Sequence, residues 1–173
     1  DSGDPQSGLW SISGHDLANT RSQPDEHRIS PSNAALLNVK WVFTSSADIS
    51  TTPTVAGDAV YFPDWSGTLF AVQKETGTLI WSRKISDYDG TNGAISRTSP
   101  AVSGDYLYIG DIQSVRETHN GANVIAVNRH NGNIRWITKV DPHPAAIITA
   151  PPVIYNGIVY VGISSNEEGL ATH

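Results

Sequence analysis

The sequence contains no cysteine, few charged residues and no long apolar run. Without cysteine, a disulfide framework, a thiolate-bound zinc ion and a thiol nucleophile are excluded. Lys and Arg number 11 against 17 Asp and Glu, which gives a net charge of −6. Nucleic acids and anionic membranes are therefore disfavoured as partners, because they are bound by clustered basic residues. The longest apolar run, residues 145–150, has the length of a strand, far short of the roughly 20 residues that a membrane span needs.

The 173 residues suffice for one domain with a real core. Five Trp and six Tyr argue against disorder, and 15 Gly and 10 Pro indicate many turns rather than long helices. Because the chain begins at Asp1 and not at Met, we expect a mature or trimmed product from which any signal peptide has been removed. We expect the protein to be secreted or periplasmic.

A strand–turn–strand pattern occurs three times in the sequence. It occupies residues 52–62 (TPTVAGDAVYF), 99–110 (SPAVSGDYLYIG) and 151–162 (PPVIYNGIVYVG). In each copy a Gly-Asp or Asn-Gly pair separates two short β-prone runs, which predicts a tight hairpin. A proline near the start of each copy recurs after 47 and then 52 residues.

A second pattern alternates with the first. Residues 69–81 (LFAVQKETGTLIW) and 124–136 (VIAVNRHNGNIRW) each consist of a strand, a polar turn and a strand that ends on Trp. The turn Gly stands at the same distance before the Trp in both copies, and Trp41 opens the series. A large flat ring at a recurring position suits the docking of one repeat unit on the next. We therefore expect Trp81 and Trp136 to be buried between neighbouring units.

Four short strands in each repeat unit are typical of a β-propeller blade. A sandwich would also have many short strands, but no recurring Gly-x-x-x-Trp. We predict an all-β fold with about three blades, at residues 41–81, 82–136 and 137–173, preceded by an N-terminal segment at residues 1–40. An open stack of three blades would expose strand edges and blade faces, so we expect this chain to be part of a larger, closed propeller.

The Ala-Val-x-x-x-Thr-Gly-x-x-x-Trp pattern resembles the tryptophan-docking motif of the quinoprotein alcohol dehydrogenases. That family consists of eight-bladed β-propellers that bind pyrroloquinoline quinone (PQQ). The stretches at residues 14–21 and 37–43 resemble the N-terminal segment of the family. Residues 94–100 (AISRTSP) and 162–169 (GISSNEEG) are most similar to its polyvinyl alcohol dehydrogenase-like branch.

The resemblance implies contacts to the quinone at three residues. Arg97 stands where the family has an Arg that pairs with a carboxylate of the cofactor, and a guanidinium can bind a carboxylate with two parallel hydrogen bonds. Thr149 matches a Thr whose hydroxyl contacts the cofactor, and Ser164 matches a Ser of the same site.

The resemblance also implies a calcium ion. Glu167, three residues after Ser164, matches a Glu that ligates calcium at the quinone, where the metal would polarise a quinone carbonyl as a Lewis acid. Glu168 is the alternative ligand if the register shifts by one residue. The other metal ligands and the catalytic Asp of the family would come from blades after His173, so the resemblance assigns no catalytic residue to this chain.

Two stretches depart from the best-known methanol dehydrogenases. Residues 48–53 lack the Glu that contacts the cofactor in those enzymes, and residues 91–93 lack their vicinal disulfide. The leading hypothesis is a PQQ-dependent dehydrogenase that oxidises alcohol groups, on a polymer or a polyol. The alternative is a non-catalytic propeller of the same ancestry that acts as a sugar-binding lectin or a scaffold. Arg97, Thr149, Ser164 and Glu167 favour the first, and the departures favour the second.

Overall fold

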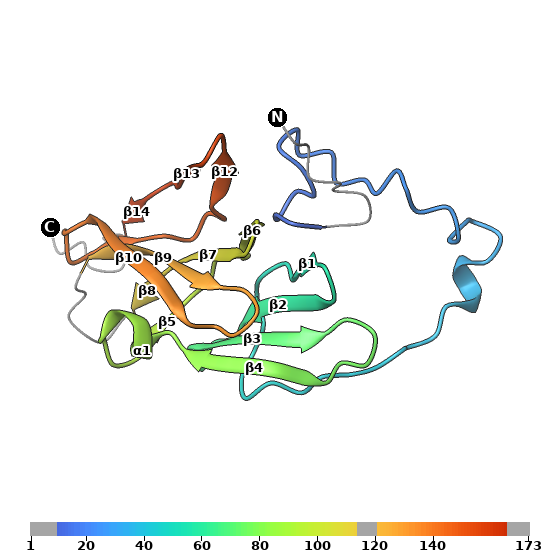
Figure 1. Cartoon of the computed structure of the whole chain (residues 1–173), viewed down its shortest axis with the longest axis horizontal. Coiled ribbons are helices and arrows are strands. Elements are labelled where there is room, and N and C mark those ends of the chain that lie inside the picture. The colour runs from blue at the N-terminus through green and yellow to red at the C-terminus, as the bar shows by residue number, and fades with distance from the viewer. Residues whose placement is uncertain (1–9, 114–120, 166–173) are drawn as a thin grey trace, which may run out of the picture.

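The computed structural model describes residues 10–113 and 121–165, and its regular secondary structure consists almost entirely of antiparallel strands (Figure 1). Helical structure in this part of the chain is limited to the 3-10 turn η1 (Ala34–Leu36) and the single-turn α1 (Ser86–Asp89). No helix among the described residues has the length and apolar character to cross a membrane. The prediction of an all-β fold is confirmed.

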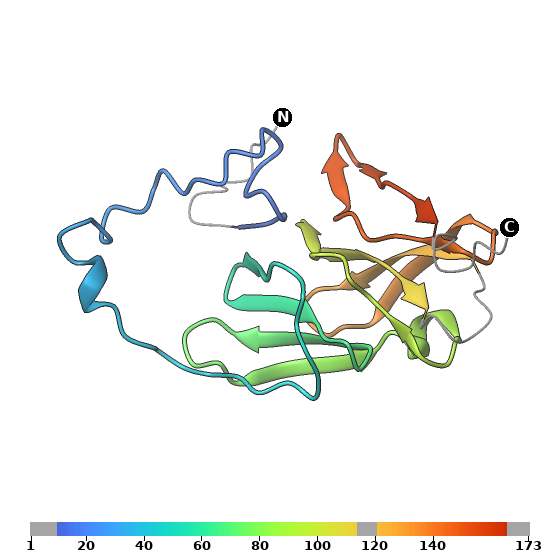
Figure 2. The ribbon, with the colours of Figure 1, turned by 180° about the vertical axis from the view of Figure 1, so that it is seen from behind.

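Two four-stranded meanders make up most of the structure (Figures 1 and 2). The first sheet has the order β1-β2-β3-β4 and consists of β1 (Thr54–Ala56), β2 (Ala59–Pro63), β3 (Thr68–Gln73) and β4 (Leu79–Lys84). The second has the order β6-β7-β9-β10 and consists of β6 (Ala101–Ser103), β7 (Tyr106–Gly110), β9 (Ala122–Asn128) and β10 (Ile134–Asp141). Each sheet has the strand content of one propeller blade.

A third unit begins with the hairpin β12 (Val153–Tyr155) and β13 (Ile158–Tyr160). Two short two-stranded sheets flank the hairpins of the second and third units. They are formed by β5 (Ala94–Ile95) with β8 (Ile112–Gln113), and by β11 (Ala146–Ile147) with β14 (Ser164–Ser165). These four strands follow or precede the hairpins that the sequence repeat predicts.

The main core lies between the first and second sheets. It is one cluster of buried side chains from both sheets, and the partly buried Tyr88 of α1 packs against it. Its members include Tyr61, Leu69, Trp81, Ile85, Leu107, Ile109 and Ile125. Burial of this apolar surface, at roughly 25 cal/mol per Å², is what fixes one sheet on the other.

Two of the recurring Trp residues, Trp41 and Trp81, each dock on the polar turn of the sheet that follows them in the chain. Trp41 donates its indole N–H to the carbonyl of Lys74 at 2.8 Å, and Trp81 donates to the carbonyl of Arg129 at 2.9 Å. A Cβ atom at Gly77 would lie 2.6 Å from the Trp41 ring, and one at Gly132 would lie 2.7 Å from the Trp81 ring. The indole therefore leaves no room for a side chain, which explains the Gly in the Gly-x-x-x-Trp pattern.

The burial predicted for Trp81 is confirmed, whereas that predicted for Trp136 is wrong. Trp81 is 6% exposed, but Trp136 is 37% exposed and contacts the ring of Tyr108 at a centroid distance of 6.0 Å. The physical reason is that each docked Trp needs the polar turn of the next unit. The described part of the third unit contains its hairpin but no second Gly turn of this kind.

Candidate functional site

The three residues predicted from the resemblance to contact a quinone follow or begin the short strands β5, β11 and β14. Arg97 follows β5, Thr149 follows β11, and Ser164 opens β14. The pairing of β11 with β14 places Ser164 opposite Ile147, two residues before Thr149. All three side chains are exposed. Glu167 and its alternative Glu168 lie outside the described residues.

A hydrogen bond and a close contact hold the second and third units together at this edge. The amide of Ile148 donates to the carbonyl of Asp111, next to β8, at 3.1 Å. A Cβ atom at Gly110 would lie 2.3 Å from Cγ2 of Ile148. The end of β11 is thus packed directly against the start of β8. Thr149 follows β11, and Arg97 follows β5, which is the strand that pairs with β8.

The named residues occupy equivalent positions of the repeat. Ser50, Arg97 and Thr149 are separated by 47 and 52 residues, the same spacings as the repeated prolines. A second repeated position lies at the same distance after the first in every unit. It is occupied by Trp65 in the first unit, by Ile112 in the second and by Ser164 in the third. Sequence reasoning named members of both sets but missed Ser50 and Trp65. The constant interval between the two positions is the signal that could have found them.

Arg97 is directed outward by two buried hydroxyl neighbours. Ser96 donates its hydroxyl to the carbonyl of Gly110 at 2.6 Å, and the hydroxyl of Thr98 accepts the Gly110 amide at 3.0 Å. Both hydroxyl side chains are buried, whereas Arg97 between them is exposed. The guanidinium lies over the ring of Trp65, 4.9 Å from its centroid. Within the described part of the chain, Arg97 forms no ion pair.

A buried carboxylate, Asp111, and a half-buried one, Asp89, lie close to β8. Asp111 is 1% exposed and accepts hydrogen bonds from the amide and the side chain of Asn123, both at 2.6 Å. Asp89, at the end of α1, accepts the Thr91 amide with one oxygen, and its buried second oxygen has no donor among the described residues. Burial raises the pKa of both groups, and together with the Asp89 charge it raises the pKa of Asp111 to about 7. A proton shared by the two carboxyl groups would supply the donor that this oxygen lacks.

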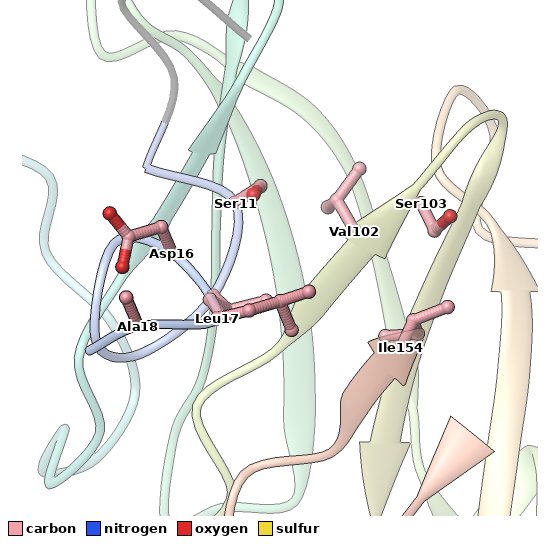
Figure 3. Close-up of a pocket in the computed structure, with 8 residues that line it drawn as sticks. Ser11, Asp16, Leu17, Ala18, Val102, Ser103 and Ile154 are labelled. Atoms are coloured by element: carbon pink, nitrogen blue, oxygen red, sulfur yellow. The ribbon is translucent and has the colours of Figure 1, made fainter. Parts of the chain in front are cut away.

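A well-defined hollow lies elsewhere, at the N-terminal loop. It has a volume of about 480 Å³ and is formed by residues 11–18 facing β6 and Ile154 (Figure 3). Leu17 projects toward the strands, and Asp16 lies on the opposite side of the loop (Figure 3). Hydrogen bonds from the hydroxyl and amide of Thr20 hold the pKa of Asp16 down at about 2. None of the sequence-named residues lines this hollow.

The side chains of Arg97, Thr149 and Ser164 fit the carboxylate end of a quinone cofactor. An exposed guanidinium without an anionic partner in the described chain, with two exposed hydroxyl side chains on the same edge, can bind and orient an anion. Among residues 10–113 and 121–165, no three His, Asp or Glu side chains form a group that could hold a metal ion, and Glu167 is not described.

The fold and its docked Trp residues define a blade repeat of the quinoprotein β-propeller type. The chain belongs to the PQQ_2 family, described as outer membrane protein assembly factor BamB, whose model matches residues 23–172. The family resemblance inferred from the docking motif is confirmed.

Proteins of two kinds are similar in sequence to this chain. A polyvinylalcohol dehydrogenase from a Pseudomonas species is 24% identical over 165 residues, which is 95% of this chain and 24% of the relative. An outer membrane protein assembly factor BamB from Escherichia coli is 32% identical over 91 residues, 51% of this chain and 21% of the relative. The chain therefore spans about a quarter of the length of these curated relatives.

Solved structures show the same two kinds of protein. The quinohemoprotein alcohol dehydrogenase from Comamonas testosteroni matches with a TM-score of 0.74 and 22% identity, over 92% of this chain and 24% of that chain. BamB from Moraxella catarrhalis matches with a TM-score of 0.55 and 18% identity, over 72% of this chain and 37% of that chain. At these identities the structures establish the fold, and the predicted propeller class is confirmed.

Proposed function

We propose that this chain is part of a PQQ-dependent propeller dehydrogenase that oxidises alcohol groups, similar to polyvinyl alcohol dehydrogenase. The observation that carries the proposal is the exposed, unneutralised guanidinium of Arg97 on the same edge as the hydroxyls of Thr149 and Ser164. The similarity to the polyvinylalcohol dehydrogenase over 95% of the chain supports it.

In this proposal each residue has a distinct task. Arg97 binds a carboxylate of the quinone through its guanidinium, and Thr149 and Ser164 offer hydroxyl groups that can donate to or accept from quinone and carboxylate oxygens. Glu167 supplies one carboxylate ligand to calcium. When bound, the quinone accepts the electrons of alcohol oxidation, with calcium as the Lewis acid at its carbonyl. We further propose that residues outside this chain close the propeller and supply the catalytic base, and that the protein is secreted or periplasmic.

The second candidate is a non-catalytic propeller, with a carbohydrate-binding or scaffold role. The likeness to BamB from two species supports it, as do the missing Glu at residues 48–53 and the missing Cys at residues 91–93. Function in this fold resides in the site and not in the propeller itself, so binding of the cofactor decides between the two.

The test is calcium-dependent reconstitution of the complete protein with PQQ, followed by reduction of a dye with a polyvinyl alcohol or polyol substrate. Arg97→Ala removes a charge-assisted hydrogen bond of about 1.5–3 kcal/mol, so it should weaken PQQ binding by roughly 10- to 150-fold. Arg135→Ala is the matched control, because Arg135 is an exposed arginine over the Tyr106 ring, on β10. Absence of PQQ binding to the wild-type protein would contradict the dehydrogenase proposal and favour the non-catalytic one.

A further inference from the structure

We propose that Trp65 is a positioning residue for Arg97, and that Ser50 holds Trp65 in place. The inference rests on the proposed anion-binding role of Arg97. It adds a contribution from the first repeat unit to a site that the sequence assigned to the second and third units alone.

The first step is the contact between Trp65 and Arg97. The guanidinium carbon is 4.9 Å from the centroid of the indole ring, within the range of about 6 Å in which a cation is attracted to an aromatic face. A guanidinium stacked by its face keeps its N–H donors free at its edge. An incoming carboxylate can therefore use the edge while the face remains on the ring.

The second step is the anchoring of the indole itself. Trp65 is 44% exposed, and a ring this open would otherwise be free to change rotamer. Its indole N–H donates to the hydroxyl of Ser50 at 2.9 Å, and its amide donates to the carbonyl of Asp48 at 2.9 Å. The ring is thus tied to the chain segment that precedes β1, at both its side chain and its backbone.

The third step is the contact between the units that carry the two residues. Trp65 and Arg97 belong to different units, so their pairing depends on how closely the turn between β2 and β3 approaches β5. Gly67, at φ +75°, has no space for a side chain, since a Cβ atom there would lie 2.3 Å from the carbonyl oxygen of Ala94. This tight contact holds the turn that carries Trp65 against β5, which Arg97 follows.

The chemical consequence is preorganisation of the anion site. An exposed arginine samples many rotamers, and fixing them costs free energy when a ligand binds. Trp65 already restricts the rotamers of Arg97 in the ligand-free protein. Ligand binding therefore loses less conformational entropy at Arg97. The predicted effect of losing Trp65 is therefore on affinity for the carboxylate ligand, in addition to any effect on stability.

The first arm of the experiment observes Arg97 directly, without cofactor. In the complete protein labelled with ¹⁵N-arginine, the Nε–Hε resonance of Arg97, assigned by Arg97→Lys, should be displaced by the ring current of Trp65. Trp65→Leu should move it to the position of a free arginine, and Trp65→Phe should leave it partly displaced. Tyr106→Leu is the matched control, because Tyr106 carries the comparable Arg135 contact at 5.9 Å, and it should leave the Arg97 resonance unchanged. An Arg97 resonance that Trp65→Leu does not move would overturn the inference.

The second arm measures PQQ affinity in the presence of calcium. Loss of an exposed cation–π contact should weaken binding by about 2- to 5-fold in Trp65→Leu, with a smaller loss in Ser50→Ala and partial recovery in Trp65→Phe. In an Arg97→Ala background, Trp65→Leu should have no further effect. An undiminished Trp65→Leu effect in that background would show that Trp65 does not act through Arg97. Absence of PQQ binding in the wild type with a displaced Arg97 resonance would instead reject the proposed function and leave the positioning of Arg97 established.

Discussion

The first and second sheets carry an aspartate at the same position of the repeat, directly after the second strand, and the two carboxylates have opposite surroundings. Asp64 and Asp111 are separated by 47 residues, and each is 1% exposed. Asp64 accepts hydrogen bonds from the amides of Ala47, Ser66 and Thr68 and from the Ser66 hydroxyl. These donors replace the water that an ionised carboxylate loses on burial.

Asp111 has fewer donors and a second carboxylate beside it. Asn123 provides two hydrogen bonds, and Asp89 on α1 faces it instead of further amide groups. The first unit has no helix at the corresponding place. A repeated residue therefore need not have a repeated role, because its energetic contribution depends on the hydrogen-bond donors and charges that the neighbouring segment places beside it.

The largest expected effect concerns the docking of one sheet on the next. Trp81→Ala removes a buried indole and should lower the free energy of unfolding of this chain by about 3–5 kcal/mol, as measured by urea denaturation. Trp136→Ala should cost clearly less, because Trp136 is 37% exposed. In the longer protein we expect the two costs to become similar, since we propose that further residues supply a turn on which Trp136 docks. Equal costs in this 173-residue chain would contradict the exposed position of Trp136.

The next largest effect is a pH dependence of stability from the Asp89–Asp111 pair. The folded pKa of Asp111 is about 7, whereas an unfolded aspartate has a pKa near 3.9. Between these values the folded state keeps a proton that the unfolded chain releases, so stability falls as the pH rises from about 4 to about 7 and is then constant. Asp89→Asn keeps the acceptor for the Thr91 amide and puts an N–H donor at the orphaned oxygen. It should reduce this slope without removing it, because burial of Asp111 also raises the pKa, and it should raise the free energy of unfolding at pH 8 by roughly 1–2 kcal/mol.

The matched control for this change is Asp64→Asn at the equivalent position of the first sheet. There an amide nitrogen would be forced against hydrogen-bond donors, so the variant should lose about 1–3 kcal/mol of stability at pH 8. Denaturant unfolding from pH 4 to pH 8 measures both variants. The same sign for Asp89→Asn and Asp64→Asn at pH 8 would rule out the contrast between the two sites.

The smallest effect compares the second unit with the third. Gly110→Ala places a methyl group 2.3 Å from the Ile148 side chain and should lower stability by about 1–3 kcal/mol through overpacking. Gly162 is the equivalent glycine of the third unit, and a Cβ atom there is 3.6 Å from its nearest neighbour. Gly162→Ala should therefore stay within about 0.5 kcal/mol of the wild type. Thermal unfolding of the two variants measures the difference. A larger loss of stability in Gly162→Ala than in Gly110→Ala would contradict the tight packing at Gly110.

The sequence by itself determined the elements and their order. Two-residue Gly-Asp and Asn-Gly turns between β-prone runs specify hairpins locally, and the Gly-x-x-x-Trp spacing specifies the docking of Trp81. The docking motif showed the resemblance to the family, and that resemblance named Arg97, Thr149 and Ser164 as site residues. These features could be predicted because each depends on residues close together in the chain, repeated at a nearly constant interval.

The tertiary structure decided which side chains from different units meet. Trp65 of the first unit lies over Arg97 of the second, and Asp89 on α1 faces Asp111 beyond β7. Neither pair follows from the repeat, since the first unit has no helix like α1 and the second has Ile112 where the first has Trp65. Such contacts depend on how closely one unit approaches the next, as the tight contacts at Gly67 and Gly110 show. That approach is set by the whole buried core between the sheets and not by any local pattern of residues.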